Sequence, residues 1–272
     1  MRIRNQSVTQ PDPAPGQPRL ASEVRRFIPD PEPTRNRRND VLEALGQAIC
    51  SGNLHEGDVL NMDEVASRFK VSRPVVREAC GVLSSRGLVV SRRRVGTVVQ
   101  GMEQWELFNN DIIRWRLNSP SRASQILELA ELRSSIEPAA AELAASRATE
   151  LEKAEISRCL AELLAAGRSG DIPMFHERDK HFHALVMISG HNSMFAQLHR
   201  FVEGMLESRY RQGLMPSQID ARALDWHEEL GRAVISGDGE SARAAAHDIV
   251  TRSAEEMLEL SQLPVRTTEA TP

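Results

Sequence analysis

Asp179 and His183 are the first residues whose types and spacing point to chemistry. They lie four positions apart in a segment of helical periodicity, so their side chains share one helix face. His227 begins another predicted helix, directly after Trp226. A carboxylate and two imidazoles that project into a helical bundle can bind a divalent metal ion such as Zn²⁺. From spacing alone we favour the simpler interpretation of surface or hydrogen-bonded core histidines, because the chain has eight His and such pairs arise by chance.

A metal-dependent helical-bundle enzyme is the alternative from another class, and Asp179, His183, His227 and Glu177 would be its residues. Such an enzyme needs an open coordination position, an activated water and a general base. The sequence contains no HExxH motif, no Gly-rich phosphate loop and no nucleophile motif built on Ser or Cys. We therefore expect no catalytic residues and no enzyme activity.

A basic segment spans residues 68–94, which contain eight Lys and Arg and a single acid, Glu78. Within it, Arg73 and Arg77 lie one turn apart near the start of a predicted helix that has Ser72 as its N-cap. Arg can donate two hydrogen bonds to O6 and N7 of guanine in the major groove, and Ser72 with the helix N-terminus can bind a phosphate. Each run of charges alone is typical of a solvated face, but the whole arrangement favours DNA binding.

Three predicted helices position these arginines. They span residues 39–51, with Asn39 or Asp40 as N-cap, residues 63–69 and residues 72–86. On the third helix an apolar stripe faces the first two helices, whereas a polar face points away. The stripe is Val75, Val76, Ala79, Val82 and Leu83, and the opposite face is Arg73, Arg77, Cys80 and Ser84.

A predicted β-hairpin follows at residues 88–99, with a basic tip formed by Arg92, Arg93 and Arg94. The tip would meet the DNA backbone or the minor groove, and Gly96 allows a close approach. The order of three helices and a hairpin is that of a winged helix-turn-helix, which places a helix in the major groove. The candidate DNA contacts are Ser72, Arg73, Val75, Arg77, Arg92, Arg93, Arg94 and Gly96.

The chain of 272 residues divides by composition into four parts, and the predicted fold class is mainly α. Residues 1–37 hold seven of the 14 prolines and are predicted to be a disordered tail. Residues 38–100 are the winged helix-turn-helix DNA-binding domain. Residues 103–262 are rich in Ala, Leu and Glu, and breaks delimit about six helices, so we predict an all-α bundle for effector binding and dimerisation. Residues 263–272 are predicted to be a flexible C-terminus.

Charge is distributed unevenly along the chain. Residues 1–100 contain 16 Lys and Arg against 11 Asp and Glu, a net charge of +5, whereas residues 101–272 contain 18 against 27, a net charge of −9. A small basic module is thus joined to a larger acidic one. The sequence has no run of roughly 18 apolar residues and no secretory signal, and its three cysteines are scattered. We predict a cytoplasmic protein with reduced thiols and no membrane association.

The segments that decide the family of the basic module are residues 52–60, Glu64-Val65-Ala66, Val71-Ser72-Arg73-Pro74-Val75-Val76-Arg77-Glu78-Ala79, Leu83 and Arg86-Gly87-Leu88. Together they resemble the GntR family of bacterial regulators, and the resemblance covers nearly all of residues 39–99. It departs at Asn61-Met62-Asp63, where the family usually has Pro-Ser-Glu. A phosphate contact that some members make with a basic residue would fall on Asp63, so we do not transfer that contact.

In the acidic module the corresponding segments are Leu132-Arg133, Ile136-Glu137-Pro138-Ala139-Ala140, Asp179 with His183, His227 with Leu230, and Gly237-Asp238. They resemble the ligand-binding (FCD) domain of the FadR-type branch of that family. The resemblance implies that Asp179, His183 and His227 hold a metal beside a carboxylate effector. The family's last His falls on Ile249, and His247 lies two residues earlier, about 200° around the helix, so it cannot simply substitute. Either the site has three protein ligands, or these groups bind an acid without metal.

Further segments are similar to repressors of galactonate catabolism, namely Trp105, Asn110-Asp111-Ile112-Ile113-Arg114-Trp115 and residues 131–138. This resemblance implies that the effector is a sugar acid. Arg133 would be the carboxylate clamp through bidentate donation, and His183 and His227 would read the polyhydroxy tail.

The predicted function is therefore a ligand-responsive transcriptional regulator. We expect a homodimeric repressor of a sugar-acid operon, for an aldonate such as gluconate or galactonate, which the acid releases from a pseudopalindromic operator in double-stranded DNA. A response to another carboxylate (a dicarboxylate, a uronate or an amino acid) is the alternative. A constitutive DNA-architectural protein is disfavoured, because it would not require so large a helical module.

Overall fold

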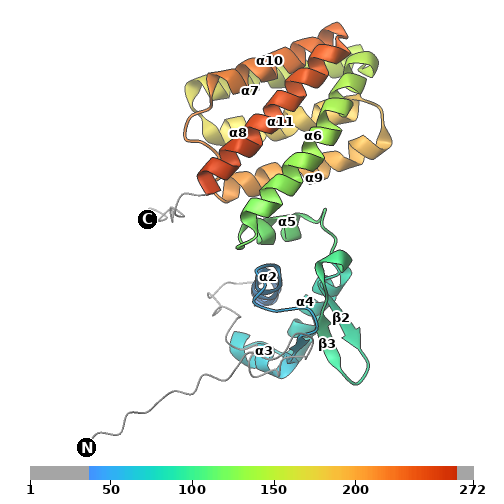
Figure 1. The fold of residues 1–272 in the computed structure, drawn as a ribbon, viewed down its shortest axis with the longest axis vertical. Helices are drawn as coiled ribbons and strands as arrows, with labels where there is room; N and C mark the ends of the chain where they lie inside the picture. Colours follow the sequence, from blue (N-terminus) through green and yellow to red (C-terminus); the bar gives the residue numbers. More distant parts are fainter. Residues whose placement is uncertain (1–36, 262–272) are drawn as a thin grey trace, which may run out of the picture. The chain divides into compact units, whose positions relative to one another are not determined.

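The computed structural model describes residues 37–261, which contain ten α-helices and one small sheet (Figure 1). It divides into two compact units, one ending at Glu106 and the other beginning at Leu107. The prediction of a mainly α protein with an N-terminal winged helix-turn-helix and a C-terminal helical domain is confirmed. The predicted tail before Arg37 and the predicted flexible C-terminus at residues 263–272 lie outside the described residues.

The first unit, residues 37–106, contains three α-helices, a three-stranded antiparallel sheet and a short 3₁₀ helix. The order of the strands in the sheet is β1-β3-β2, and Val59 of β1 lies opposite Val98 of β3. The elements are α2 (Arg37–Cys50), β1 (Val59–Leu60), α3 (Met62–Phe69), α4 (Arg73–Ser85), β2 (Val89–Arg92), β3 (Gly96–Val99) and η1 (Met102–Gln104). The sequence did not reveal β1, because a strand of two residues shows no alternation and exists only through its pairing with β3.

The helix starts of the first unit follow the predicted capping only in part. The side chain of Asn61 caps α3 by accepting hydrogen bonds from the backbone N–H groups of Asp63 and Glu64. Ser72 stands at the N-cap position of α4, as predicted, although its hydroxyl makes no capping hydrogen bond within residues 37–261. The predicted N-cap of the first helix is wrong, because α2 already includes Arg37, whose Nη1 donates to the carbonyl of Lys70 at 2.8 Å.

The apolar stripe of α4 is mostly as predicted, because Val76, Ala79 and Leu83 are buried against the rest of the unit. Cys80 is a correction: it was assigned to the polar face but is buried, with its Sγ 3.9 Å from the Sδ of Met62. A thiol is small and apolar enough to fill the space beside α3, so the stripe extends further around α4 than the helical wheel indicated.

The segment that leaves the first unit returns to the end of α4. The backbone N–H of Glu106 donates to the carbonyl of Arg86 at 3.0 Å, and the side chain of Gln100 donates to the carbonyl of Gly87 at 2.9 Å. Gly87 has a φ of +77°, and a Cβ there would overlap the carbonyl oxygen of Gln104. A glycine is therefore required both for the turn after α4 and for this close approach.

The second unit, residues 107–261, is a bundle of seven α-helices, one more than the predicted six. They are α5 (Asn110–Leu117), α6 (Arg122–Arg147), α7 (Glu150–Ser169), α8 (Ile172–Ser189), α9 (Ser193–Arg211), α10 (Ala221–Ser236) and α11 (Gly239–Ser261). The boundary between α6 and α7 was missed because no Gly or Pro marks it. Thr149 and Glu152 form a capping box there, so the Thr-x-x-Glu pattern was the available signal.

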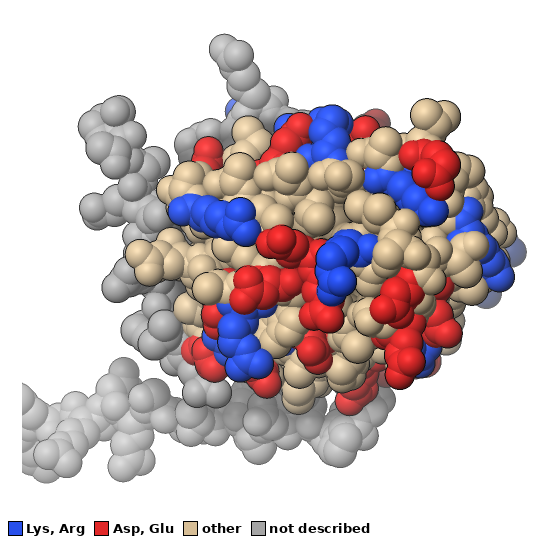
Figure 2. Space-filling view, turned by 90° about the horizontal axis from the view of Figure 1, so that it is seen from above, with Lys and Arg blue, Asp and Glu red and all other residues tan. Residues whose placement is uncertain are grey.

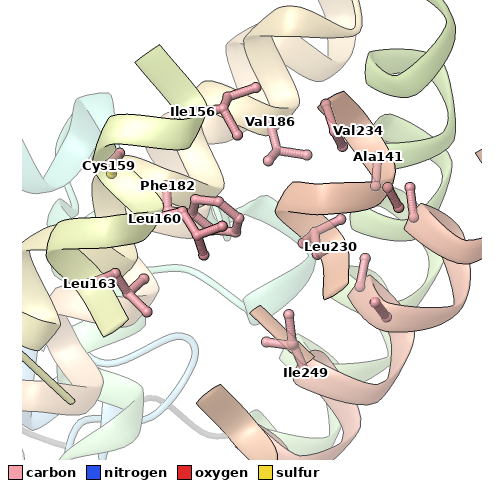
Figure 3. Packing of buried hydrophobic residues seen from close by; sticks show 14 of the residues in the cluster. Ala141, Ile156, Cys159, Leu160, Leu163, Phe182, Val186, Leu230, Val234 and Ile249 are labelled. Carbon is pink, nitrogen blue, oxygen red and sulfur yellow. The ribbon is translucent and has the colours of Figure 1, made fainter. Parts of the chain in front are cut away.

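The core of the bundle lies between α6, α7, α8, α10 and α11, and Figure 3 shows its side chains pointing toward one another. Phe182 of α8 is completely buried there, and Leu160 and Leu230 pack into the same cluster. A Cβ at Gly231 would lie 2.6 Å from Leu160, so this glycine lets α10 approach α7 closely. Among residues 37–261, no helix is long and apolar enough to span a membrane.

Candidate functional site

A cavity of about 430 Å³, including its opening to solvent, lies inside the helical unit between α6, α8, α9, α10 and α11. Its apolar lining includes Phe175, Leu206, Met215 and Ile249. Its polar and charged lining is Arg133, Asp179, His183, Arg209, His227, Arg252, Ser253 and Glu256.

Three of the predicted site residues meet in this cavity. Asp179, His183 and His227 are each at most 4% exposed, and one ligand atom from each lies within 4.8 Å of the others. The Oδ1 atom of Asp179 is 3.0 Å from Nε2 of His227 and 3.5 Å from Nε2 of His183. One carboxylate oxygen and two imidazole nitrogens therefore converge on one point.

The second nitrogen of each imidazole is held by a hydrogen-bond acceptor. His227 Nδ1 lies 2.6 Å from the carbonyl oxygen of Ala223, and His183 Nδ1 lies 2.7 Å from Oε2 of Glu137. Both Nδ1 atoms must carry hydrogen to donate to these oxygens, so the Nε2 atoms are the nitrogens that face Asp179 and that would bind a metal ion there in place of a proton. Metal-binding histidines are oriented in the same way, by a carbonyl or carboxylate behind the ring. The three residues fit a divalent metal ion.

The buried charges of this cluster stabilise one another. Burial opposes the charged form of His183, but Glu137 and Asp179 raise the pKa of His183 to about 9. Burial also disfavours the Glu137 carboxylate, yet Arg133 and His183 together lower the pKa of Glu137 to about 2. The pKa of Asp179 is held well below its usual value by the two histidines, against the effect of burial. The cluster thus contains ionised carboxylates.

The fourth position of the expected ligand set contributes no polar atom. Ile249 is buried and lines the cavity, whereas His247 on the same helix is exposed to solvent. Two positions along a helix turn the side-chain direction by about 200°, which agrees with Ile249 lining the cavity while His247 is exposed. The side of the cluster that faces the cavity is therefore apolar at the position of the missing imidazole.

Arg133 is not a free carboxylate clamp. Its Nε and Nη2 both donate to the Glu137 carboxylate, the latter at 3.3 Å, and only Nη1 is directed elsewhere, to Ser253 Oγ at 3.4 Å. The i,i+4 spacing of Arg133 and Glu137 was visible in the sequence, and it produces a buried ion pair that occupies most of the guanidinium.

Sequence reasoning missed Arg209, which is the second buried arginine of the cavity. Arg209 Nη1 donates to Ser253 Oγ at 3.0 Å, and its Nη2 donates to Glu256 Oε2 at 2.6 Å. Ser253 therefore accepts from two guanidinium groups, one from α6 and one from α9. Ser253 and Glu256 lie on α11, more than 40 positions away from Arg209 in the sequence, so no local spacing pattern could have indicated these two contacts.

A second group of possible metal ligands lies between α8 and α9. His176, Glu177 and Glu207 also have ligand atoms within 4.8 Å of one another. The ammonium group of Lys180 donates to Glu177 at 2.7 Å and to Glu207 at 2.8 Å. Lys180 and Arg211 together pair with these two carboxylates, so the structure shows the group as an ion-pair cluster.

The candidate DNA contacts lie on the first unit. Arg73 and Arg77 are exposed on α4, and the exposed side chains of Arg92, Arg93 and Arg94 lie at the end of β2 and in the turn before β3. Gly96 has a φ of +114°, which favours glycine at the return of this turn. Ser72 is exposed, whereas Val75 is half-buried at the edge of the apolar stripe. By contrast, on the face of the helical unit seen in Figure 2, acidic and basic side chains are interspersed.

Comparisons with known proteins agree with this division. Residues 37–99 match the model of bacterial regulatory proteins of the gntR family, and residues 128–252 match the FCD domain. The galactonate operon transcriptional repressor of Escherichia coli (strain K12) is 28% identical over 230 residues, which cover 84% of this chain and all of the relative. The putative L-lactate dehydrogenase operon regulatory protein of the same strain is 27% identical over 217 residues, covering 78% of this chain and 82% of the relative.

A solved structure of Lar, which controls the expression of the Listeria monocytogenes agr system, superposes with a TM-score of 0.57 at 15% identity. The match covers 84% of this chain and 100% of that one, and it supports the fold. The family and its relatives are transcriptional regulators and not enzymes, so the interpretation as a regulator is confirmed over the metal-dependent enzyme. The chain belongs to the GntR family of bacterial transcriptional regulators and carries an FCD domain as its second unit.

Proposed function

We propose that this regulator binds a small carboxylate effector in the cavity of its FCD domain, that the effector is a sugar acid of the aldonate type, and that its binding releases the operator. The observation that carries the proposal is the convergence of Arg133 Nη1 and Arg209 Nη1 on Ser253 Oγ inside the cavity. A carboxylate can accept hydrogen bonds from both guanidinium groups and from the serine hydroxyl.

The rest of the cavity suits the polyhydroxy part of such an acid. Hydroxyl groups are donors as well as acceptors, and the carboxylates of Asp179 and Glu256 are acceptors at the cavity wall. His183 and His227 complete the polar wall. A galactonate operon transcriptional repressor is among the relatives, which makes galactonate and gluconate the first effectors to test.

Asp179, His183 and His227 would hold a divalent metal ion, with Zn²⁺ as the first candidate. A bound metal would supply a compact positive charge that attracts carboxylate and hydroxyl oxygens. Glu137 and the carbonyl of Ala223 keep the two imidazoles in the orientation that such an ion requires. With Ile249 at the fourth position, three side chains from this chain would bind the ion.

The first unit would read the operator through α4. Arg73 and Arg77 would contact base edges in the major groove, with Ser72 at a phosphate and Val75 beside the bases. The turn that contains Arg92, Arg93 and Arg94, together with Gly96, would contact the backbone or the minor groove. The regulator would act as a homodimer, so the operator would be pseudopalindromic.

A thermal-shift screen tests the effector. Galactonate, gluconate, a uronate, a dicarboxylate, lactate and an amino acid are added separately to the protein, with and without a chelator. A bound acid raises the melting temperature by mass action. We expect the shift from an aldonate, and its loss in Ser253→Ala but not in Ser146→Ala, which removes an exposed hydroxyl of α6.

A shift from lactate or a dicarboxylate alone would overturn the aldonate assignment, and a shift that persists in Ser253→Ala would overturn the placement of the carboxylate. Persistence in chelator would remove the metal from the proposal. The release step is checked on duplexes that the protein selects from a random-sequence pool, because the acid that shifts the melting temperature should also lower the affinity for those duplexes.

A further inference from the structure

The ion pair between Asp63 and Arg73 links the starts of α3 and α4. The Asp63 carboxylate contacts Nε of Arg73, and both side chains remain about 60% exposed, at 59% and 61%. The side chain of Asn61 accepts from the backbone N–H of Asp63 at 3.0 Å, which fixes the first turn of α3 from which the Asp63 side chain projects. An acid in the first turn is also favoured by the helix dipole.

The two arginines of α4 therefore differ, although both are exposed and one turn apart. Arg73 has a carboxylate partner on α3, whereas Arg77 has no ion-pair partner within residues 37–261. A surface that must approach a polyanion thus has a negative charge next to one of its two helix arginines.

We propose that Asp63 is a specificity-determining residue of the DNA interface, which positions Arg73 for a base contact and weakens the binding of the same arginine to phosphates of non-operator DNA. This inference rests on the proposed role of Arg73 in base reading. The contact between Asp63 and Arg73 at the junction of α3 and α4 carries it.

The geometry of the guanidinium explains the first effect. Because Asp63 occupies Nε, the two Nη groups of Arg73 remain as a pair of donors, which matches the O6 and N7 acceptors of guanine. A side chain that is already oriented loses less rotational freedom when it binds a base.

Electrostatic repulsion explains the second effect. On random DNA an arginine gains most by turning to a phosphate, since that contact is independent of sequence. Arg73 can do so only by leaving Asp63, and the uncovered carboxylate then faces the phosphates. The Asp63 carboxylate therefore weakens the binding of Arg73 to phosphates of random DNA more than its binding to a base of the operator.

The test compares Asp63→Asn with Glu78→Gln, which removes one negative charge from α4 itself without removing the partner of Arg73. The probes are a duplex that the wild-type protein selects from a random-sequence pool and an unselected random duplex, with both dissociation constants measured at several salt concentrations. For Asp63→Asn we expect random-duplex binding to tighten about threefold or more, and the specificity ratio to fall by a similar factor. Without Asp63 as its partner, Arg73 should also neutralise about one more phosphate of random DNA. The slope of the logarithm of the affinity against the logarithm of the salt concentration should then steepen by about 0.9.

A specificity ratio that is unchanged in Asp63→Asn, or that falls equally in Glu78→Gln, overturns the inference. Arg73→Lys keeps the positive charge but lacks the planar pair of Nη donors, and we expect it to lower the specificity ratio as well. Arg73→Ala distinguishes the proposed role of Arg73 from that of Asp63. If Arg73→Ala keeps the wild-type specificity ratio, Arg73 does not read a base and Asp63 cannot act through it. If Arg73→Ala lowers the specificity ratio but Asp63→Asn does not, Arg73 reads a base without help from Asp63.

Discussion

The carboxylate of Glu137 is bound on α6 by the guanidinium of Arg133, one helical turn before it, and both side chains are 3% exposed. The same carboxylate accepts from His183 Nδ1, so the ion pair supports the histidine that faces the cavity. Arg133 therefore mainly binds Glu137 and so supports His183, and only its Nη1 is directed to Ser253 in the cavity.

Replacing Arg133 by Ala should destabilise the fold before it affects any ligand. The substitution leaves the Glu137 carboxylate buried beside His183 alone, and breaking a buried ion pair costs about 3–5 kcal/mol. Urea unfolding measures this loss. Arg243→Ala is the control, because it removes an exposed pair with Glu142 and should change the stability little. An Arg133→Ala protein as stable as the control variant would contradict the framework role.

Metal binding should depend on the three convergent side chains. Protein stripped with a chelator should bind one Zn²⁺ or Co²⁺ per chain in calorimetry, and Co²⁺ should give a visible absorption band. His227→Ala should remove both signals, because it deletes a ligand whose orientation the Ala223 carbonyl fixes. His247→Ala removes an exposed imidazole from α11 and should bind metal as the wild type does. Equal binding by the two variants would place the metal elsewhere.

The arginines of the turn between β2 and β3 should contribute affinity without selectivity. Arg93→Gln combined with Arg94→Gln should weaken binding to selected and random duplexes by similar factors, since phosphate contacts carry no sequence information. The salt slope should decrease by about 0.9 for each phosphate that the variant no longer neutralises. Arg243→Gln on the helical unit serves as the charge control. A loss of affinity confined to the selected duplex would mean that the turn reads bases.

Glu207 should make the stability depend on acidic pH. Burial opposes ionisation, but hydrogen bonds from Lys180, His176 and Arg211 lower its pKa from 4.5 to about 2. A carboxyl whose pKa is lower in the folded state stabilises that state above its unfolded pKa, and the contribution is lost as the pH falls from about 4.5 through about 2. Glu207→Gln should thus be less stable than the wild type at neutral pH, with a difference that shrinks on acidification.

Urea unfolding of both proteins at about pH 7 and about pH 3.5 measures this change. Glu203→Gln, one turn earlier on α9, is the control, because its carboxylate has only a long contact of 3.9 Å with His199. A stability difference for Glu207→Gln that stays constant between the two pH values would show that the carboxylate acts through packing instead of charge.

The sequence predicted those features that arise from local patterns. Asp179 and His183 share a face because four residues make about one turn, and Arg73 and Arg77 do so for the same reason. That His227 meets Asp179 followed only from the family resemblance, since the two residues are 48 positions apart. Contacts between helices that are distant in the sequence, such as those of Arg209 with Ser253 and Glu256, produce no recognisable pattern of residue spacing. Cys80 was misplaced because a helical wheel gives the angle of a side chain but not the position of its neighbours.

The hydrogen bond from the backbone of Glu106 to the carbonyl of Arg86 holds the last residue of the first unit against the end of α4. Residue 107 already belongs to the FCD unit, and the residue before it is fastened to the end of α4. The end of the first unit is thus held directly to the helix that carries Arg73 and Arg77, and a side chain at Gly87 would disturb both. The chain therefore does not leave the DNA-binding unit directly from β3 but closes it first, so the last residues of this unit are part of its own framework.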